Sequence, residues 1–304
     1  MSEVNEQVVS AAKRIRWKPA RGQIQRRDLH NGQGAGYLLF IPASDPVDAP
    51  CFVSIPGLAQ NYREHAQIFA PPCEQQGAVM LVPQFAENRP DDYQRLGRLG
   101  LGQRADLLLN RCLEEVALMT GADTSRIYLF GYSGGAQFAH RYLLAHPHRV
   151  ANAVLAGAGW YTFPDNRLKY PYGIRSSHKL PGVLFNPEEF LRIPVTVLIG
   201  EHDVGSTSLR RNPELDEQQG VTRVERAHKW VAAMQAAAVT HGFQSRVSCI
   251  EVPGTDHSFR QFTRRGALAE RVFGALFGTS ADSPQGARAG AAPDAVATLE
   301  TEAP

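Results

Sequence analysis

The sequence predicts an α/β fold in which helices flank a mainly parallel central sheet. Three observations indicate this fold. Short apolar runs recur along the chain, several of them are apolar throughout rather than alternating with polar residues, and longer segments of helical periodicity separate them. Strands that are covered on both faces have such runs, and a repeated strand–helix–strand order gives parallel strands joined by right-handed crossovers.

The expected elements follow one another in a regular order. The segments QIQRRDL and GYLLFIPA are expected to pair antiparallel at the edge of the sheet. One helix is expected over 104–121, a second over 223–242, where Gly242 suits a left-handed C-cap, and a third over 258–278. Apolar runs predict strands at 36–43, 51–57, 78–85, 126–130, 152–159, 195–200 and 246–254.

One folded unit, 21–279, is expected between two loose ends. Residues 1–20 are expected to be flexible, and 280–304, rich in Ala, Pro, Gly and Ser, is expected to be a disordered tail because it has too few large apolar residues to offset the ordering entropy. The range 160–194 contains five prolines and many aromatic residues without clear periodicity. Such a long irregular excursion predicts a lid-like insertion, since segments of this kind are more often functional than passive.

Composition argues against several classes of protein. The formal net charge is +2, and the basic clusters at 13–16 and 26–27 are short and lack interleaved aromatic residues, so no nucleic-acid partner is expected. The chain has neither a signal-peptide pattern at its N-terminus nor an apolar run of about 18 residues, so we expect a cytoplasmic protein without a membrane span. Its scattered cysteines do not have the spacing of a metal site and are expected to be small buried thiols, with a disulfide left open: Cys51, Cys73, Cys112 and Cys249.

Ser133 stands in the segment RIYLFGYSGGAQFAH, where a predicted strand runs through Gly-Tyr-Ser-Gly-Gly into a predicted helix. A serine at such a sharp turn is held in a strained conformation that needs clearance, which Gly131 and Gly135 would supply. The N-terminal amides of the helix would favour a negative charge that develops beside the hydroxyl. The context predicts a nucleophilic serine, and the alternative is a tight turn in which the serine has no chemical role.

A serine hydroxyl needs a base to remove its proton. Of ten histidines, His257 lies just past the last predicted strand, where its side chain would reach over the carboxyl edge of the sheet. Six of the others are expected to be elsewhere: His140, His146 and His148 are carried away by the helix after Ser133, His178 falls in the irregular segment, and His65 and His228 fall in exposed helical stretches.

The imidazole in turn needs an acceptor that fixes its tautomer. Asp203, three residues past the strand VTVLIG, is favoured over Glu201 and over Asp256, because adjacent residues such as Asp256 and His257 rarely face each other. For the oxyanion, the N–H of Gly134 is one expected donor, and the N–H of Leu58 is the other, with Ala59 as the alternative.

These residues resemble the α/β-hydrolase superfamily from about residue 36 to residue 277. The segment DTSRIYLFGYSGGAQFAHRYLLAHPHRV is most similar to the esterase and polyhydroxyalkanoate-depolymerase-like branch, in which a D-x-x-R-[VI]-[YF]-[VL]-x-G-x-S-x-G motif precedes the nucleophile helix. The order Ser133, Asp203, His257 is that of α/β-hydrolases. Pro56 stands where many members of the branch carry histidine. The resemblance implies neither a metal nor an organic cofactor.

The sequence therefore predicts a serine hydrolase that cleaves a carboxylic ester through an acyl-enzyme. A small-molecule or oligomeric ester would be its substrate, with Tyr132, Trp160 and Tyr161 shaping the pocket and Tyr170 and Tyr172 as further candidates, although core packing explains these aromatic residues equally well. The open alternatives are a serine peptidase or amidase, an acyltransferase, and a ligand-binding protein on a hydrolase scaffold.

Overall fold

The computed structural model describes residues 19–30, 32, 34–85, 93–97, 104–205 and 209–278. The expected tail 280–304 and nearly all of the expected flexible segment 1–20 lie outside the described residues. Eight strands form one sheet in the order β1-β2-β4-β3-β5-β6-β7-β8. The strands are β1 (Ile24–Asp28), β2 (Gly36–Phe40), β3 (Pro50–Ile55), β4 (Val79–Gln84), β5 (Asp123–Tyr132), β6 (Val150–Ala156), β7 (Val195–Gly200) and β8 (Val247–Val252).

The sheet has the mainly parallel arrangement that the sequence predicts. Strand β1 pairs antiparallel with β2, and β2 pairs antiparallel with β4, whereas every pairing from β4 through β3 and β5 to β8 is parallel. The expected antiparallel edge is thus confirmed. Because β3, β5, β6, β7 and β8 all point the same way, the loops that follow them meet at one edge of the sheet.

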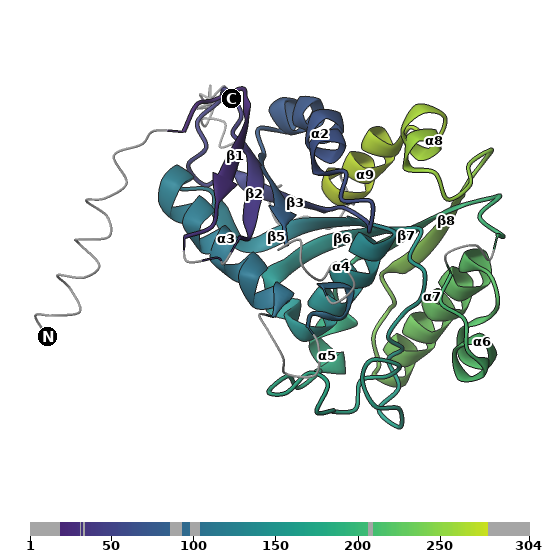
Figure 1. Cartoon of the computed structure of the whole chain (residues 1–304). Helices are drawn as coiled ribbons and strands as arrows, with labels where there is room; N and C mark the ends of the chain where they lie inside the picture. Colours follow the sequence, from purple (N-terminus) through teal and green to yellow (C-terminus); the bar gives the residue numbers. More distant parts are fainter. Residues whose placement is uncertain are drawn as a thin grey trace, which may run out of the picture.

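Helices cover both faces of the sheet (Figure 1). The helices α2 (Tyr62–Gln76), α8 (Phe259–Arg264) and α9 (Leu268–Phe277) lie on one face, and α3 (Ala105–Thr120), α4 (Gly134–Ala145) and α7 (Arg223–Thr240) lie on the other. Shorter helices lie in the connections: η1 (Tyr93–Arg95), η2 (Pro147–Arg149), α5 (Pro187–Phe190) and α6 (Pro213–Gln219).

The apolar run of strand β5 does not alternate with polar residues because the strand is covered on both faces. Ile127 and Leu129 belong to the core beneath α3, α4 and α7, whereas Phe130 and Tyr132 belong to the core beneath α2, α8 and α9. Successive side chains of a strand point to opposite faces, so a strand covered on both sides must be apolar at every position.

The last expected helix, over 258–278, is instead two helices. The chain breaks between α8 and α9, where Ala267 has a φ of 45°. At Gly266, a methyl group would lie 2.7 Å from the carbonyl oxygen of Phe262 and 2.9 Å from Val252. The turn therefore brings the backbone close to the end of β8, and the apolar periodicity that runs across it does not reveal the break.

The irregular segment 160–194 contains one short helix, α5, and an isolated bridge between Lys169 and Arg175. Its first residues are part of the core. Tyr161 is fully buried, and the indole of Trp230 on α7 donates a hydrogen bond to the carbonyl oxygen of Thr162. The beginning of the expected insertion therefore packs between α4 and α7.

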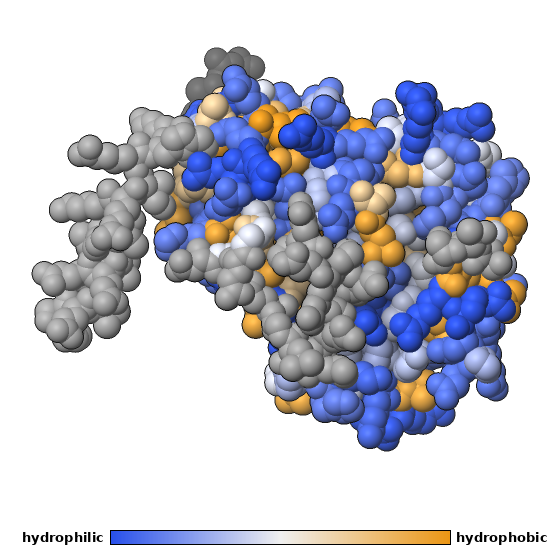
Figure 2. Space-filling model, in the orientation of Figure 1, coloured by the Kyte–Doolittle hydropathy of each residue, from blue (hydrophilic) through white to orange (hydrophobic). Residues whose placement is uncertain are grey.

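The described part of the face in Figure 2 is mainly hydrophilic, with apolar residues in small scattered patches. Within the described ranges, no helix has the length and apolar character needed to cross a membrane, and no group of three or more His, Cys, Asp or Glu side chains could hold a metal ion. All four cysteines are free thiols, and those at positions 51, 73 and 112 are buried, as the sequence predicts.

Candidate active site

Ser133 occupies the turn between β5 and α4 with a φ of 53° and a ψ of −113°. This is the strained backbone expected of a serine presented at a strand-to-helix turn. A methyl group on Gly131 would lie 2.4 Å from the carbonyl oxygen of Gly135, and one on Gly135 would lie 1.9 Å from the carbonyl oxygen of Ile55. The two glycines are required by this close approach of backbones, for the reason the sequence suggests.

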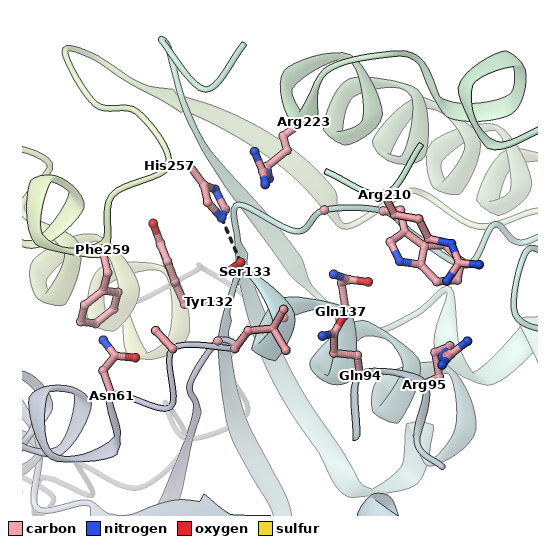
Figure 3. A pocket seen from close by; sticks show the side chains of 16 residues that line it. Asn61, Gln94, Arg95, Tyr132, Ser133, Gln137, Arg210, Arg223, His257 and Phe259 are labelled. Carbon is pink, nitrogen blue, oxygen red and sulfur yellow. Dashed lines mark hydrogen bonds between the residues drawn. The ribbon is translucent and has the colours of Figure 1, made fainter. Parts of the chain in front are cut away.

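His257, in the loop between β8 and α8, lies beside Ser133. Its Nε2 is 2.9 Å from Ser133 Oγ (Figure 3). Its Nδ1 is 2.8 Å from Asp203 Oδ2. A carboxylate only accepts hydrogen bonds, so Nδ1 carries the hydrogen and Nε2 of the neutral ring accepts the hydroxyl hydrogen of Ser133. The structure thus brings together the three residues that the sequence singles out.

Asp203 lies in the loop after β7 and is only 2% exposed. Its Oδ1 accepts a hydrogen bond from Arg223 at the start of α7, at 3.2 Å, so the buried carboxylate has an ion-pair partner as well as the imidazole. The two carboxylates that the sequence left open have other partners. Glu201 accepts a hydrogen bond from the N–H of Gly254, and Asp256 accepts one from the N–H of Ser258.

Gly157, directly after β6, leaves room for the imidazole of His257, and the sequence analysis did not identify this role. Its φ is 59°, and a methyl group there would lie 3.3 Å from both Cε1 and Nδ1 of His257 and 3.8 Å from Asp203 Oδ2. The imidazole therefore packs directly on the backbone of β6. The only signal in the sequence is a glycine directly after an apolar strand.

The expected oxyanion donors lie on the other side of Ser133. A methyl group on Gly57 would lie 3.2 Å from Ser133 Cβ and 3.7 Å from the nitrogen of Gly134, so the loop after β3 closely approaches the start of α4. The hydroxyl of Tyr93 donates a hydrogen bond to the carbonyl oxygen of Pro56 and holds this loop. Leu58 and Gly134 both line the pocket that contains Ser133.

That pocket has a volume of about 530 Å³. Its lining residues form two walls on opposite sides of Ser133 (Figure 3). We call one the aromatic wall, which consists of Tyr132, Phe259 and Asn61. We call the other the cationic wall, which consists of Gln94, Arg95, Gln137, Trp160 and Arg210.

The aromatic residues expected at the pocket fall into two groups. Tyr132 and Trp160 line it. Tyr161 does not, because its ring is buried and stacks on Trp230 with 4.9 Å between the ring centroids. Tyr170 is also buried and donates a hydrogen bond to the carbonyl oxygen of Arg95, whereas Tyr172 packs beside Trp160.

The hydroxyl of Tyr132 is buried, and no hydrogen-bond partner for it lies among the described residues. Burial and the negative charges of Asp203 and Asp256 raise the pKa of Tyr132 above its ordinary value, against the opposing effect of Arg223. The ring stands beside the imidazole of His257, with 5.8 Å between the centroids. Tyr132 is therefore a neutral wall of the pocket and does not supply a charge.

His65 corrects a second expectation. The sequence places it in an exposed stretch, but the side chain is fully buried on α2. Its Nδ1 is 2.8 Å from Ser54 Oγ on β3, and its ring stacks on Phe259 with 4.2 Å between the centroids. Burial lowers the pKa of His65 to about 3, so the ring is neutral. The expected exposure of His228 is confirmed.

Solved structures provide the comparison with known proteins. A poly(3-hydroxybutyrate) depolymerase from Bordetella parapertussis is 25% identical, with a TM-score of 0.68 over 86% of this chain and 98% of its own. The chain is an α/β-hydrolase by fold. This α/β-hydrolase is also similar to poly(aspartic acid) hydrolase-1 from Sphingomonas sp. KT-1, at 22% identity and a TM-score of 0.67 over 82% of this chain and 98% of that one.

An esterase from Pyrobaculum calidifontis is a more distant neighbour of this α/β-hydrolase, at 17% identity and a TM-score of 0.51 over 90% of this chain and 91% of its own. Neither a family model nor a curated protein matches the sequence. The neighbours support a place in the esterase-like branch, in agreement with the resemblance of the segment around Ser133.

Proposed function

We propose that the protein is a serine hydrolase that cleaves carboxylic esters through an acyl-enzyme, with Ser133, His257 and Asp203 as its catalytic residues. The observation that carries the proposal is the continuous hydrogen-bonded series from Ser133 Oγ through His257 to Asp203 Oδ2, with distances of 2.9 and 2.8 Å, at the floor of an accessible pocket. The similarity to solved hydrolases supports the same class of reaction.

The geometry suggests how each group would act. His257 Nε2 accepts the proton of Ser133 as Oγ attacks the ester carbonyl, and the resulting imidazolium donates that proton to the leaving alcohol. Asp203 holds the Nδ1–H tautomer and stabilises the imidazolium. A water molecule then attacks the acyl carbon, and His257 takes its proton and returns it to Ser133.

The negative charge on the carbonyl oxygen needs donors that are already in place. The N–H groups of Gly134 and Leu58 are the proposed donors, because the loop after β3 closely approaches the start of α4 beside Ser133. Backbone donors fixed by a helix N-terminus and a held loop do not need to reorganise as the charge develops, which is why such sites lower the barrier.

The test is to measure the activity of the Ser133→Ala variant on p-nitrophenyl acetate and its labelling by a fluorophosphonate probe. We expect kcat to fall on the order of 10⁴-fold or more with the fold retained, and labelling to disappear. Ser125→Ala, an exposed serine on β5, is the matched control and should keep both. Full activity in Ser133→Ala, or no labelling of the native protein, would contradict the proposal.

Two further assays separate the ester hydrolase from the other enzymes that a serine acyl-enzyme permits. Acyl esters and the corresponding aminoacyl amides are compared as substrates, and we expect the ester to be preferred. Methanol is then added as a competing acceptor, and we expect the free acid to remain the main product. Preferred amide cleavage would make the protein an amidase, and preferred formation of the methyl ester would make it an acyltransferase.

A further inference from the structure

Charge is unevenly distributed among the described residues that line the pocket. Among the described residues that line the pocket there are three arginines, Arg95, Arg210 and Arg223, and no acidic side chain. Arg223 is held by Asp203 beside the imidazole. Arg95 and Arg210 stand on the other side of Ser133, next to Gln94 and Gln137 (Figure 3).

A fourth arginine lies behind this wall. Arg141 on α4 is fully buried, and its guanidinium carbon is 4.1 Å from the ring centroid of Trp160, which also has the guanidinium of Arg210 at 5.6 Å. All its hydrogen bonds go to neutral acceptors: Thr162 Oγ1 and the carbonyl oxygens of Gln94 and Gln137. Within the described part of the chain its Nη2 has no partner.

These guanidinium groups are close enough to affect one another. Burial, together with the positive charges of Arg95 and Arg210 and against the opposing effect of Tyr170, lowers the pKa of Arg141 to about 10. At neutral pH the group remains charged. Arg95 and Arg210 in the wall and Arg141 behind it therefore favour a negative charge in the pocket.

The wall also has a polar group without a partner. Gln137 is 7% exposed and lines the pocket, and its Oε1 is buried with no hydrogen-bond partner among the described residues. The amide of Gln94 lies near the start of α4, since a methyl group on Gly134 would be 3.3 Å from Gln94 Nε2. Gln94 Nε2 is a donor that can bind a carboxylate, whereas Gln137 Oε1 is an acceptor and needs a donor group of the bound molecule.

Two acidic residues near the site, within the described part of the chain, are engaged elsewhere. Asp203 is 2% exposed and is shared by His257 and Arg223. Asp256 is bound to the first turn of α8 and lies on the side of Tyr132, away from the cationic wall.

We infer that the cationic wall, with Arg210, Arg95 and Trp160 at its outer part, binds a carboxylate of the substrate, so that the preferred substrate is an ester that carries a free carboxylate several bonds from the scissile carbonyl. The inference rests on the proposed function and specifies its substrate class. Guanidinium groups suit this role because they form charge-assisted hydrogen bonds with a carboxylate in a planar geometry.

The experiment compares matched pairs of esters that differ only in charge. One pair is the mono-p-nitrophenyl ester of adipic acid and that of adipamic acid, which places the charge in the acyl part. The other pair is 4-acetoxybutanoate and its amide, which places the charge in the alcohol part. We expect kcat/KM for the anionic member of at least one pair to exceed that of the neutral member about tenfold, and less so at high salt.

Arg210→Gln should lower this charge preference about fivefold, with partial retention in Arg210→Lys. Arg211→Gln is the matched control, because Arg211 is the next residue, is also exposed and pairs with Asp216 outside the pocket. Arg211→Gln should keep the preference. Equal rates for both members of both pairs, or equal loss in the two variants, would overturn the inference.

A binding measurement keeps this result separate from the proposed function. Titration calorimetry of adipate and of adipamide with Ser133→Ala protein needs no turnover. Adipate should bind more tightly than adipamide, and Arg210→Gln should remove the difference. If native protein cleaves neutral esters and reacts with fluorophosphonate but shows no charge preference, the substrate class is wrong and the hydrolase stands. If the native protein neither cleaves neutral esters nor reacts with fluorophosphonate, the proposed hydrolase activity is wrong. Equal binding of adipate and adipamide would reject the carboxylate site as well.

Discussion

Two serine–histidine pairs in this protein have almost the same distance between hydroxyl oxygen and imidazole nitrogen, but their surroundings differ. Ser133 Oγ is 2.9 Å from His257 Nε2, and Ser54 Oγ is 2.8 Å from His65 Nδ1. The side chain of His257 is 26% exposed at the pocket, and its second nitrogen is bonded to Asp203. Ser54 and His65 are fully buried, and Nε2 of His65 has no partner among the described residues.

The comparison shows that the distance between hydroxyl and imidazole does not by itself make a nucleophile. The pair at Ser133 has a strained turn that exposes the hydroxyl, helix amides beside it and a carboxylate that fixes the imidazole. The buried pair has none of these. Its imidazole stacks on Phe259, two residues after His257, so the buried pair supports the aromatic wall of the pocket.

The largest expected effect comes from removing the carboxylate that distinguishes the two pairs. In Asp203→Asn the amide no longer enforces the Nδ1–H tautomer or stabilises the imidazolium, and kcat on p-nitrophenyl acetate should fall on the order of 10⁴-fold. Circular dichroism checks the fold, because Arg223 loses its buried partner.

Glu201→Gln is the control for this variant. Glu201 is half-exposed and accepts a hydrogen bond from the N–H of Gly254, so its loss should change kcat less than tenfold. A larger loss in Glu201→Gln than in Asp203→Asn would show that the wrong carboxylate has been assigned to His257.

A smaller and different effect is expected from Ser54→Ala. His65 then loses the only partner of its Nδ1 within the described chain, and the free energy of unfolding should fall by about 1–3 kcal/mol. Urea denaturation measures this change, and kcat/KM should stay within about twofold because Ser54 does not reach the pocket. If Ser54→Ala abolishes activity in a folded protein, the buried pair has a chemical role and the contrast with Ser133 fails.

The fold and the meeting of Ser133, His257 and Asp203 could be predicted from the sequence because their signals are local. Buried parallel strands need continuous apolar runs, and a serine at a strand-to-helix turn needs glycines on both sides. The position of His257 followed from the strand before it, since the loops after parallel strands meet at one edge. These rules need no knowledge of distant side chains.

The cationic wall and the burial of His65 could not be obtained in that way. Arg95 and Arg210 are 115 positions apart, and nothing local in the sequence shows that their side chains line one pocket. His65 did have a local signal, because Phe69 and Cys73 follow it at intervals of four residues and share its buried face of α2.

The smallest effect, and the one that isolates the buried pair, is the response of stability to acid. Burial lowers the pKa of His65 from 6.5 in the unfolded chain to about 3. Between these values the unfolded chain binds a proton that the folded protein does not, so the free energy of unfolding falls as the pH falls, by about 1.4 kcal/mol per pH unit. Burial also lowers the pKa of His140, which adds a contribution of the same sign.

The double variant Ser54→Ala/His65→Leu removes the first contribution and leaves the second. Between pH 7.5 and pH 5.0, the loss of unfolding free energy in urea should be about 2 kcal/mol smaller in the double variant than in the native protein. Ser54→Ala alone is the control, since it keeps a buried neutral imidazole and should therefore keep the full acid sensitivity. If the double variant loses stability in acid as steeply as the control, His65 is not the group whose protonation the folded core excludes. The buried pair would then differ from the exposed pair only in its solvent exposure.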